Sequence, residues 1–151
     1  MPLEIERKFL VTGDTWRGLG RVVRIRQGYL ASAESLSVRV RQAGPRAFLT
    51  VKGGKGLVRA EYEYEIPFDE AGEMLDRLCR RPLIEKQRHV LDRGGLEWVV
   101  DEFEGELAGL VLAEIELDSE HQQVALPDWV GTEVTDDPRY LNASLSAHGR
   151  P

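Results

Sequence analysis

Pairs of glutamates separated by a single residue recur along the sequence, and three of these pairs lie in distant segments. They are Glu4 and Glu6, Glu61 and Glu63, and Glu114 and Glu116. Residues two apart in a β-strand point to the same face, so each pair would present two neighbouring carboxylates. Carboxylate oxygens are the ligands that hard divalent cations such as Mg²⁺ and Mn²⁺ prefer. The acidic pairs therefore indicate a metal-binding surface, provided that their strands meet.

Basic residues follow the same spacing, some beside these glutamates and some on other stretches of the chain. They are Lys8, Arg39, Arg41, Lys52, Arg59, Lys86 and Arg88. The planar fork of an arginine matches the oxygens of a phosphate group, and a cluster of such side chains suits a polyanion. Acidic and basic residues together therefore describe a site for a complex of divalent metal with polyphosphate.

The stretches that carry these residues alternate between polar and apolar side chains, as half-buried β-strands do. The pattern predicts strands over Met1–Val11, Arg21–Ala31, Ser35–Gln42, Ala47–Lys52, Leu57–Pro67, Arg81–Asp92, Leu96–Phe103 and Leu110–Asp118. Short turns join most of them, without a βαβ rhythm, which favours a mostly antiparallel sheet. About eight such strands can close into a barrel. The expected fold is mainly β with a few helices.

Helical spacing is confined to two segments. One helix is expected from Asp69 to about Arg80, and a short one from Arg139 to about His148 after a proline-containing start. Between them, Pro127–Gly131 is expected to be irregular. Gly28 is expected to mark a β-bulge that decides which face of its strand Tyr29 uses.

Composition limits the function classes. A chain of 151 residues with 42% hydrophobic content suits one domain, 1–151. A net charge of −6 argues against general affinity for nucleic acid or anionic membrane. No apolar run is long enough to span a bilayer and no leader is recognisable, so a cytoplasmic location is expected. The single cysteine, Cys79, is expected to face a core, and three scattered histidines do not predict zinc.

Alternation alone leaves two arrangements open. The charged faces could lie outside an open sheet, where each cross-strand ion pair contributes less than about 1 kcal/mol. They could instead line the inside of a barrel. Burying that many ions is costly unless a charged guest compensates them, so an interior arrangement requires a ligand.

Several motifs in order resemble the CYTH domain family, also called triphosphate tunnel metalloenzymes. Glu4–Lys8, E-I-E-R-K, resembles the E-x-E-x-K signature of that family. Later segments that resemble its motifs are Gln27–Leu30, Arg39–Arg41, Leu49–Gly53, Arg59–Glu63, Glu85–Arg88, Trp98–Asp101, Ala113–Glu116 and Gly131–Thr135. The resemblance implies a closed antiparallel barrel forming a charged tunnel, with triphosphate inside and a divalent metal, Mg²⁺ or Mn²⁺.

The resemblance also implies roles for individual residues. The metal ligands would be Glu4, Glu6, Glu61, Glu63, Glu114 and Glu116, and the phosphate-binding residues Lys8, Arg39, Arg41, Lys52, Arg59, Lys86 and Arg88. Asp101 joins this set if its strand keeps its alternation. Lys8 and Tyr29 would be catalytic, with Lys8 favoured to position water or phosphate rather than act as a base.

Members of this family resemble inorganic triphosphatases, thiamine triphosphatases or class IV adenylate cyclases. A cyclase needs an aromatic pocket for adenine, and only 7% of this chain is aromatic. Hydrolysis of inorganic triphosphate to phosphate and pyrophosphate is therefore expected. The alternatives are the thiamine triphosphatase or cyclase activities, a non-catalytic polyphosphate- or nucleotide-binding module, or a structural β domain. The expected partner is a triphosphate-bearing small molecule, and a homodimer is left open.

Overall fold

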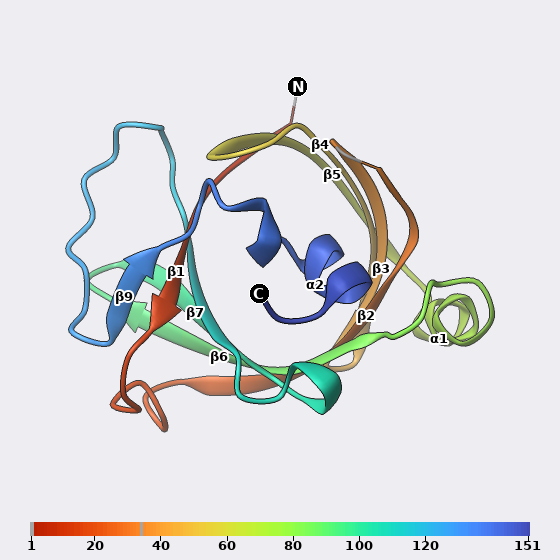
Figure 1. Cartoon of the computed structure of the whole chain (residues 1–151), viewed down its shortest axis with the longest axis horizontal. Coiled ribbons are helices and arrows are strands. Elements are labelled where there is room, and N and C mark those ends of the chain that lie inside the picture. The colour runs from red at the N-terminus through yellow and green to blue at the C-terminus, as the bar shows by residue number, and fades with distance from the viewer. Residues whose placement is uncertain (1, 34) are drawn as a thin grey trace.

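One antiparallel sheet closes on itself and surrounds the C-terminal segment (Figure 1). The computed structural model describes residues 2–33 and 35–151. The strands are β1 (Leu3–Val11), β2 (Arg21–Ala33), β3 (Leu36–Ala43), β4 (Arg46–Gly53), β5 (Val58–Ile66), β6 (Ile84–Arg93), β7 (Leu96–Phe103), β8 (Val111–Glu116) and β9 (Val130–Glu133). The helices are α1 (Phe68–Arg77), η1 (Gly105–Leu107), η2 (Pro138–Tyr140) and α2 (Asn142–His148).

Strand β1 closes the ring. On one side Glu6–Leu10 of this strand pair with β8, and on the other side its first residues, Leu3–Ile5, pair with β5. The strands β5, β4, β3, β2, β6, β7, β8 and β1 thus form the predicted eight-stranded barrel. The end of β1 pairs with β9, which lies outside this closed ring. The prediction that Pro127–Gly131 is irregular is therefore wrong at its end, because Val130 and Gly131 join a strand whose partner lies far away in sequence.

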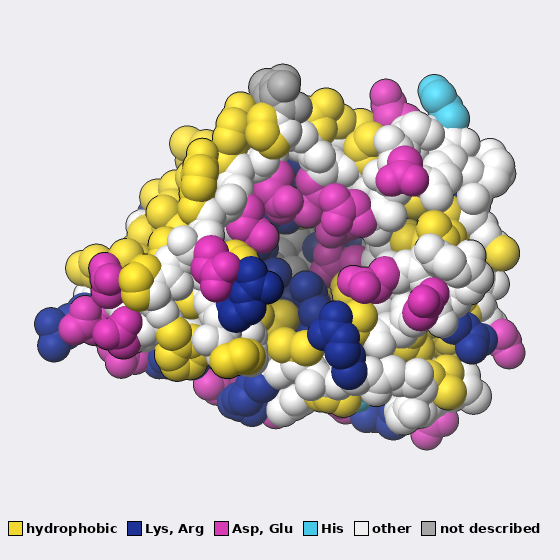
Figure 2. All heavy atoms as spheres, turned by 180° about the vertical axis from the view of Figure 1, so that it is seen from behind, with side chains coloured by type: hydrophobic (Ala, Val, Ile, Leu, Met, Phe, Trp, Pro, Cys, Tyr) yellow, Lys and Arg dark blue, Asp and Glu magenta, His cyan; other side chains and the backbone are white. Residues whose placement is uncertain are grey.

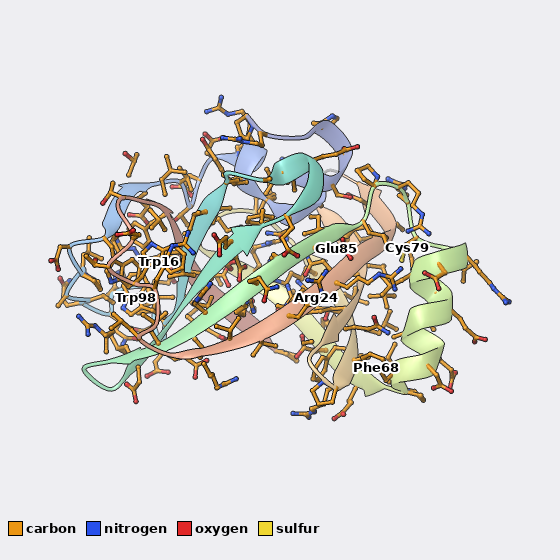
Figure 3. All side chains as sticks on the ribbon, turned by 90° about the horizontal axis from the view of Figure 1, so that it is seen from below. Trp16, Arg24, Phe68, Cys79, Glu85 and Trp98 are labelled. Atoms are coloured by element: carbon orange, nitrogen blue, oxygen red, sulfur yellow. The ribbon has the colours of Figure 1, made fainter. Side chains whose placement is uncertain are left out.

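The largest apolar core lies outside the barrel wall. It contains Phe9, Trp16, Trp98, Ile115 and Trp129, all at most 2% exposed. Phe9, Trp98 and Ile115 alternate along β1, β7 and β8 with the charged residues, so the two kinds occupy opposite faces. Figure 3 shows Trp16 and Trp98 together at one end of the molecule. Apolar residues therefore cover this part of the outer wall, and the charged residues of the same strands face inward.

A second apolar cluster joins α1 to the outer face of β3 and β4. Ala71 and Leu75 of the helix pack against Val40 and Ala47, and Cys79 is buried beside them, as expected. The helix ends at Arg77, earlier than the sequence predicts, and β6 begins at Ile84 rather than Arg81. Neither helix nor any other in the described residues is long and apolar enough to cross a membrane.

The irregularity in β2 lies after Tyr29 rather than at Gly28. The register with β3 shifts between Tyr29 and Ala31. Tyr29 therefore keeps the parity of Ile25 and Gln27 and faces the barrel interior, where it is 5% exposed. Gly28 serves close packing instead, because a Cβ there would lie 2.7 Å from Leu83 Cδ2.

The C-terminal segment enters the ring instead of forming one continuous helix. Pro138–Tyr140 forms a 3₁₀ turn that begins as predicted, since the Asp137 side chain accepts a hydrogen bond from Arg139 N. Leu141 is extended, with ψ of 138°, so α2 begins only at Asn142. Leu145 of α2 packs on a third apolar cluster with Ile84, Phe103 and Leu112. Together these contacts plug one end of the barrel (Figure 1).

Replacing Gly20 with alanine is expected to lower the free energy of unfolding by about 1–3 kcal/mol, the usual range for overpacking. A Cβ at Gly20 would lie 1.8 Å from the carbonyl oxygen of Val90, so the backbone must move. Gly53→Ala is the matched control, because its Cβ would meet only Ser35 O, at 3.8 Å. Denaturant unfolding of both variants measures the difference. Equal stability of the two variants would contradict this close approach.

Candidate active site inside the barrel

The strand register brings the predicted charged residues onto one inner surface. Glu6 lies opposite Glu116 and Lys8 opposite Glu114 across the β1–β8 pair. Cross-strand partners lie on the same face of the sheet, so the charged side chains of neighbouring strands lie next to one another. The same holds for Lys52 with Glu61 in β4 and β5, for Arg88 with Asp101 in β6 and β7, and for Tyr29 with Arg39 in β2 and β3. All fifteen predicted residues, including Asp101, therefore belong to one inner wall.

One end of this wall is open to solvent. Figure 2, taken from behind Figure 1, shows a hollow with acidic side chains on one side and lysine or arginine on the other. Glu63 and Glu116 are exposed, whereas Glu4, Glu114 and Asp101 are buried. A pocket on this wall is lined by Glu4, Glu6, Lys8, Gly56, Arg59, Val134, Thr135, Asp137 and Leu141. The tunnel is thus accessible to a guest from the end away from α2.

Lys52 bridges two of the carboxylates. Its Nζ lies 3.0 Å from Glu4 Oε1 and 3.3 Å from Glu61 Oε2. Burial opposes ionisation of Glu4, but Lys52 and a hydrogen bond from Glu61 lower its pKa. Burial and the proximity of Glu4 raise the pKa of Glu61. One ammonium therefore does not satisfy both carboxylates, and the pair still attracts positive charge.

Glu6 and Glu114 form a second carboxylate pair. Burial and the charges of Glu114 and Glu4 raise the pKa of Glu6 well above its ordinary 4.5. Although burial opposes it, Lys8 and a hydrogen bond from Glu6 lower the pKa of Glu114 well below that value. These opposite shifts mean that Glu6 takes up a proton before Glu114 does as the pH falls. A divalent cation could occupy the place between the two groups, because two oxygen ligands already converge there.

Two arginines present buried groups that lack a protein partner. In the described part of the chain, Nε of Arg39 and Nε of Arg59 are buried without a hydrogen bond. The Arg39 Nη2 donates to Thr50 Oγ1 at 3.2 Å, and Thr50 donates to Glu63 at 3.0 Å. Buried donors are nearly always satisfied in proteins. Unpartnered guanidinium nitrogens on a tunnel wall therefore indicate an anionic ligand.

The plugged end carries a network of buried cations. Asp101 accepts both hydrogen bonds of the Arg88 fork, at 2.8 and 2.9 Å, and lies 2.7 Å from Lys86 Nζ. Burial opposes ionisation of Asp101, but Arg88 and Lys86 hold its pKa at about 2. Burial, with the charges of Arg39 and Arg88, lowers the pKa of Arg41 to about 9. The cations therefore exceed what Asp101 compensates at this end.

Lys86 and Lys8 are both tied to the C-terminal segment. Lys86 is completely buried, and its Nζ donates to Asn142 Oδ1 at 2.9 Å and lies 5.2 Å from the Phe103 ring centroid. Burial, opposed by Asp101, lowers the pKa of Lys86 to about 7. The Lys8 Nζ donates to the carbonyl oxygen of Tyr140 at 3.1 Å. The segment that plugs the tunnel thus contacts two of the predicted phosphate-binding side chains.

The formal charge of this inner wall sums to zero. It holds seven carboxylates and seven cations. The carboxylates are Glu4, Glu6, Glu61, Glu63, Asp101, Glu114 and Glu116, and the cations are Lys8, Arg39, Arg41, Lys52, Arg59, Lys86 and Arg88. A polyphosphate accompanied by divalent cations would fit this wall, because its own charges largely cancel. Within the described residues no three potential ligands form a preassembled metal cage. The carboxylate pairs fit a cation that takes its remaining ligands from phosphate and water, as Mg²⁺ commonly does.

Three polar side chains inside the barrel are not predicted as site residues by the sequence pattern. Gln27 shares the parity of Tyr29, and Thr50 that of Lys52, so their inward position follows once the strand faces are known. Neither is charged, and neither stands out as a site residue. Asn142 has no such signal, because only the turn at Leu141 carries it into the barrel.

Comparison with known proteins agrees with this geometry. The CYTH domain model matches residues 2–148. An inorganic triphosphatase of Acetivibrio thermocellus is 52% identical over 146 residues, covering 96% of this chain and 94% of that protein. An inorganic triphosphatase of Nitrosomonas europaea is 41% identical over 148 residues, covering 95% and 96%.

A solved structure supports the same relationship. The crystal structure of an inorganic triphosphatase superposes with a TM-score of 0.71 at 37% identity, covering 100% of this chain and 99% of that one. Family model, sequence relatives and structure all extend over nearly the whole chain. The chain therefore belongs to the CYTH family.

Proposed function

We propose that this protein is an inorganic triphosphatase, which hydrolyses tripolyphosphate to phosphate and pyrophosphate inside the barrel. The observation that carries the proposal is the closed inner wall on which buried, unpartnered arginine groups face carboxylate pairs. Such a wall stabilises a linear anion together with its cations. The relatives in Acetivibrio and Nitrosomonas bear the name of this activity.

Phosphoryl transfer to water chiefly requires that oxygen charge be neutralised and the nucleophile oriented. Arg39, Arg41 and Arg59 would hold the non-bridging oxygens of the phosphate chain, since they extend into the barrel from β3 and β5, the two strands on either side of β4. Lys8 would position the attacking water or the terminal phosphate as a hydrogen-bond donor. Its donation to the Tyr140 carbonyl supports this role over that of a base. Tyr29 would assist from the opposite wall.

A divalent cation, Mg²⁺ or Mn²⁺, would complete the site. When bound, it neutralises phosphate oxygens and lowers the pKa of a bound water. Glu4, Glu6, Glu61 and Glu114 would hold it, with Glu63 and Glu116 near the open mouth. Arg88 and Lys86 would supply positive charge at the plugged end, and Lys52 would keep the carboxylate pairs in place.

Inorganic triphosphate is favoured over an organic triphosphate by the place of the tryptophans. All three are at most 2% exposed and pack in the outer core, so none can stack on a base or a thiazolium ring in the tunnel. We treat residues 1–151 as one tunnel domain. A cytoplasmic setting is proposed from the single buried thiol.

Turnover of tripolyphosphate, thiamine triphosphate and ATP, each with Mg²⁺ and with Mn²⁺, tests the proposal. We expect tripolyphosphate to give the highest kcat/KM and hydrolysis to stop when metal is chelated. In the metal-loaded state, tripolyphosphate at 100 times its Kd should add about 2.7 kcal/mol to the free energy of unfolding. Preference for thiamine triphosphate or ATP would assign an alternative activity. A thermal shift without hydrolysis would indicate a binding module.

A further inference from the structure

The carboxamide of Asn142 joins two side chains of the barrel wall. Its Oδ1 accepts hydrogen bonds from Lys86 Nζ and from Gln27 Nε2, each at 2.9 Å. Both partners are 0% exposed. The two bonds come from groups that can only donate in this arrangement, so the accepting atom must be the carbonyl oxygen. The orientation of Asn142 is thereby fixed by the wall.

Gln27 passes this orientation on to Arg41. Because its Nε2 is committed to Asn142, its Oε1 points the other way and accepts from Arg41 Nε at 2.7 Å. A flipped Gln27 amide would place an N–H group against the Arg41 Nε–H, and this contact is repulsive. The Arg41 guanidinium is thus held through Nε, and within the described residues its two Nη groups make no hydrogen bond, so they can serve another partner.

The starting point of this chain of bonds is also fixed. Lys86 always donates when protonated, and Asp101 at 2.7 Å holds it in place. The direction of every hydrogen bond therefore follows in order from Lys86 to Asn142, Gln27 and Arg41. Within the described residues, no other side chain of α2 forms a hydrogen bond with a lysine or arginine of the tunnel. Ser146, on the same helix, donates instead to the Pro82 carbonyl at 3.1 Å.

We propose that Asn142 is a positioning residue for polyphosphate binding, which acts through Gln27 to orient Arg41 toward the inner end of the phosphate chain. The inference rests on the proposed function and adds to it a specific task for the C-terminal plug. Asn142 need not touch the substrate. Its contribution is to keep Arg41 in one conformation, so that binding does not require the guanidinium to be ordered first.

The test compares Asn142→Ala and Gln27→Met, singly and together. Each single change breaks the same chain of bonds, and the loss of one such hydrogen bond is expected to raise KM for tripolyphosphate roughly tenfold. The kcat value should stay within about twofold, because the groups around the reacting water are untouched. If Asn142 acts through Gln27, the double variant should match either single one instead of multiplying their effects.

Ser146→Ala is the matched control. It removes a hydrogen bond between the same helix and the segment that precedes β6, without touching the tunnel cations, so KM should stay at the wild-type value. An equal rise in KM for Ser146→Ala, an unchanged KM for folded Asn142→Ala, or multiplying effects in the double variant would each overturn the proposal. If Asn142→Ala does not fold, Asn142→Ser is tested in its place. The serine side chain is too short for its hydroxyl to bridge Lys86 and Gln27, so the same chain of bonds is broken.

Failure of this inference is distinguishable from failure of the proposed function. An inactive wild type on tripolyphosphate would reject the function. An active wild type with unchanged KM in the variants would reject only the task given to Asn142. Calorimetric titration with tripolyphosphate gives the same comparison as a change in Kd, without turnover.

Discussion

Glu6→Gln is expected to lower the kcat for tripolyphosphate roughly 100- to 1,000-fold. The loss of one preorganised electrostatic contact has an effect of about this size in other enzymes. The same substitution should stabilise the metal-free protein. Glu6 lies inside the barrel beside Glu114 and Glu4. Its burial and the charges of these two carboxylates raise its pKa. Glutamine keeps the shape and the hydrogen bond but removes the repulsion. Function and stability are therefore expected to change in opposite directions.

The pH dependence of stability supplies a second measurement on this variant. A group whose pKa is raised by folding stabilises the native state below its unfolded pKa, here about 4.5, and loses that contribution as pH rises through the folded value. The stability gain of Glu6→Gln over wild type should therefore be small at pH 4 and grow toward pH 8. Denaturant unfolding without metal at several pH values checks this.

Glu65→Gln is the control for these experiments. Glu65 lies on β5 and is exposed, and it pairs with Arg46 at 2.7 Å on the surface. Turnover should stay within about twofold of wild type, since exposed pairs contribute little. Full activity of Glu6→Gln, or a stability gain that does not depend on pH, would contradict the place given to Glu6.

Asp101→Asn is expected to lower the free energy of unfolding at pH 7 by about 3–5 kcal/mol, the cost of leaving a buried charge uncompensated. Asp101 is 0% exposed and holds both Arg88 and Lys86. For a chain of 151 residues this corresponds to a loss of roughly 6–20 °C in Tm. Calorimetric or spectroscopic melting measures it.

The dependence of stability on pH in the acidic range should change in Asp101→Asn as well. Its pKa of about 2 lies below the ordinary 3.8, so its stabilising effect is present above pH 4 and is lost as pH falls through 2. The difference between Asp101→Asn and wild type should shrink over that interval. Glu102→Gln, next along β7, is the control, because its pair with Arg17 is partly exposed to solvent, whereas Asp101 is completely buried. A loss below about 1 kcal/mol for Asp101→Asn would show that Asp101 is not the counter-ion of this network.

The alternation of the sequence was sufficient to predict the eight barrel strands and the shared face of Glu4, Glu6 and Lys8. A strand has a period of two, so a correct strand assignment fixes which side chains lie together. The strength of this signal comes from charges that repeat on the same parity in distant strands. The ends of elements were predicted less well, as in α1 and β6, because packing against the barrel decides where a helix stops.

The choice between an outer and an inner charged face could not be made from alternation, because both arrangements have the same sequence pattern. Only the pairing of β1 with both β5 and β8 closes the sheet and puts one face inside. The tertiary structure also decided the place of β9, the inward turn of Tyr29 and the bonds of Asn142 to Lys86 and Gln27. The place of β9 and the bonds of Asn142 depend on residues more than 50 positions apart meeting at hydrogen-bond distance, as Asn142 and Lys86 do. Local spacing carries no information about such encounters, since closure of the ring creates them.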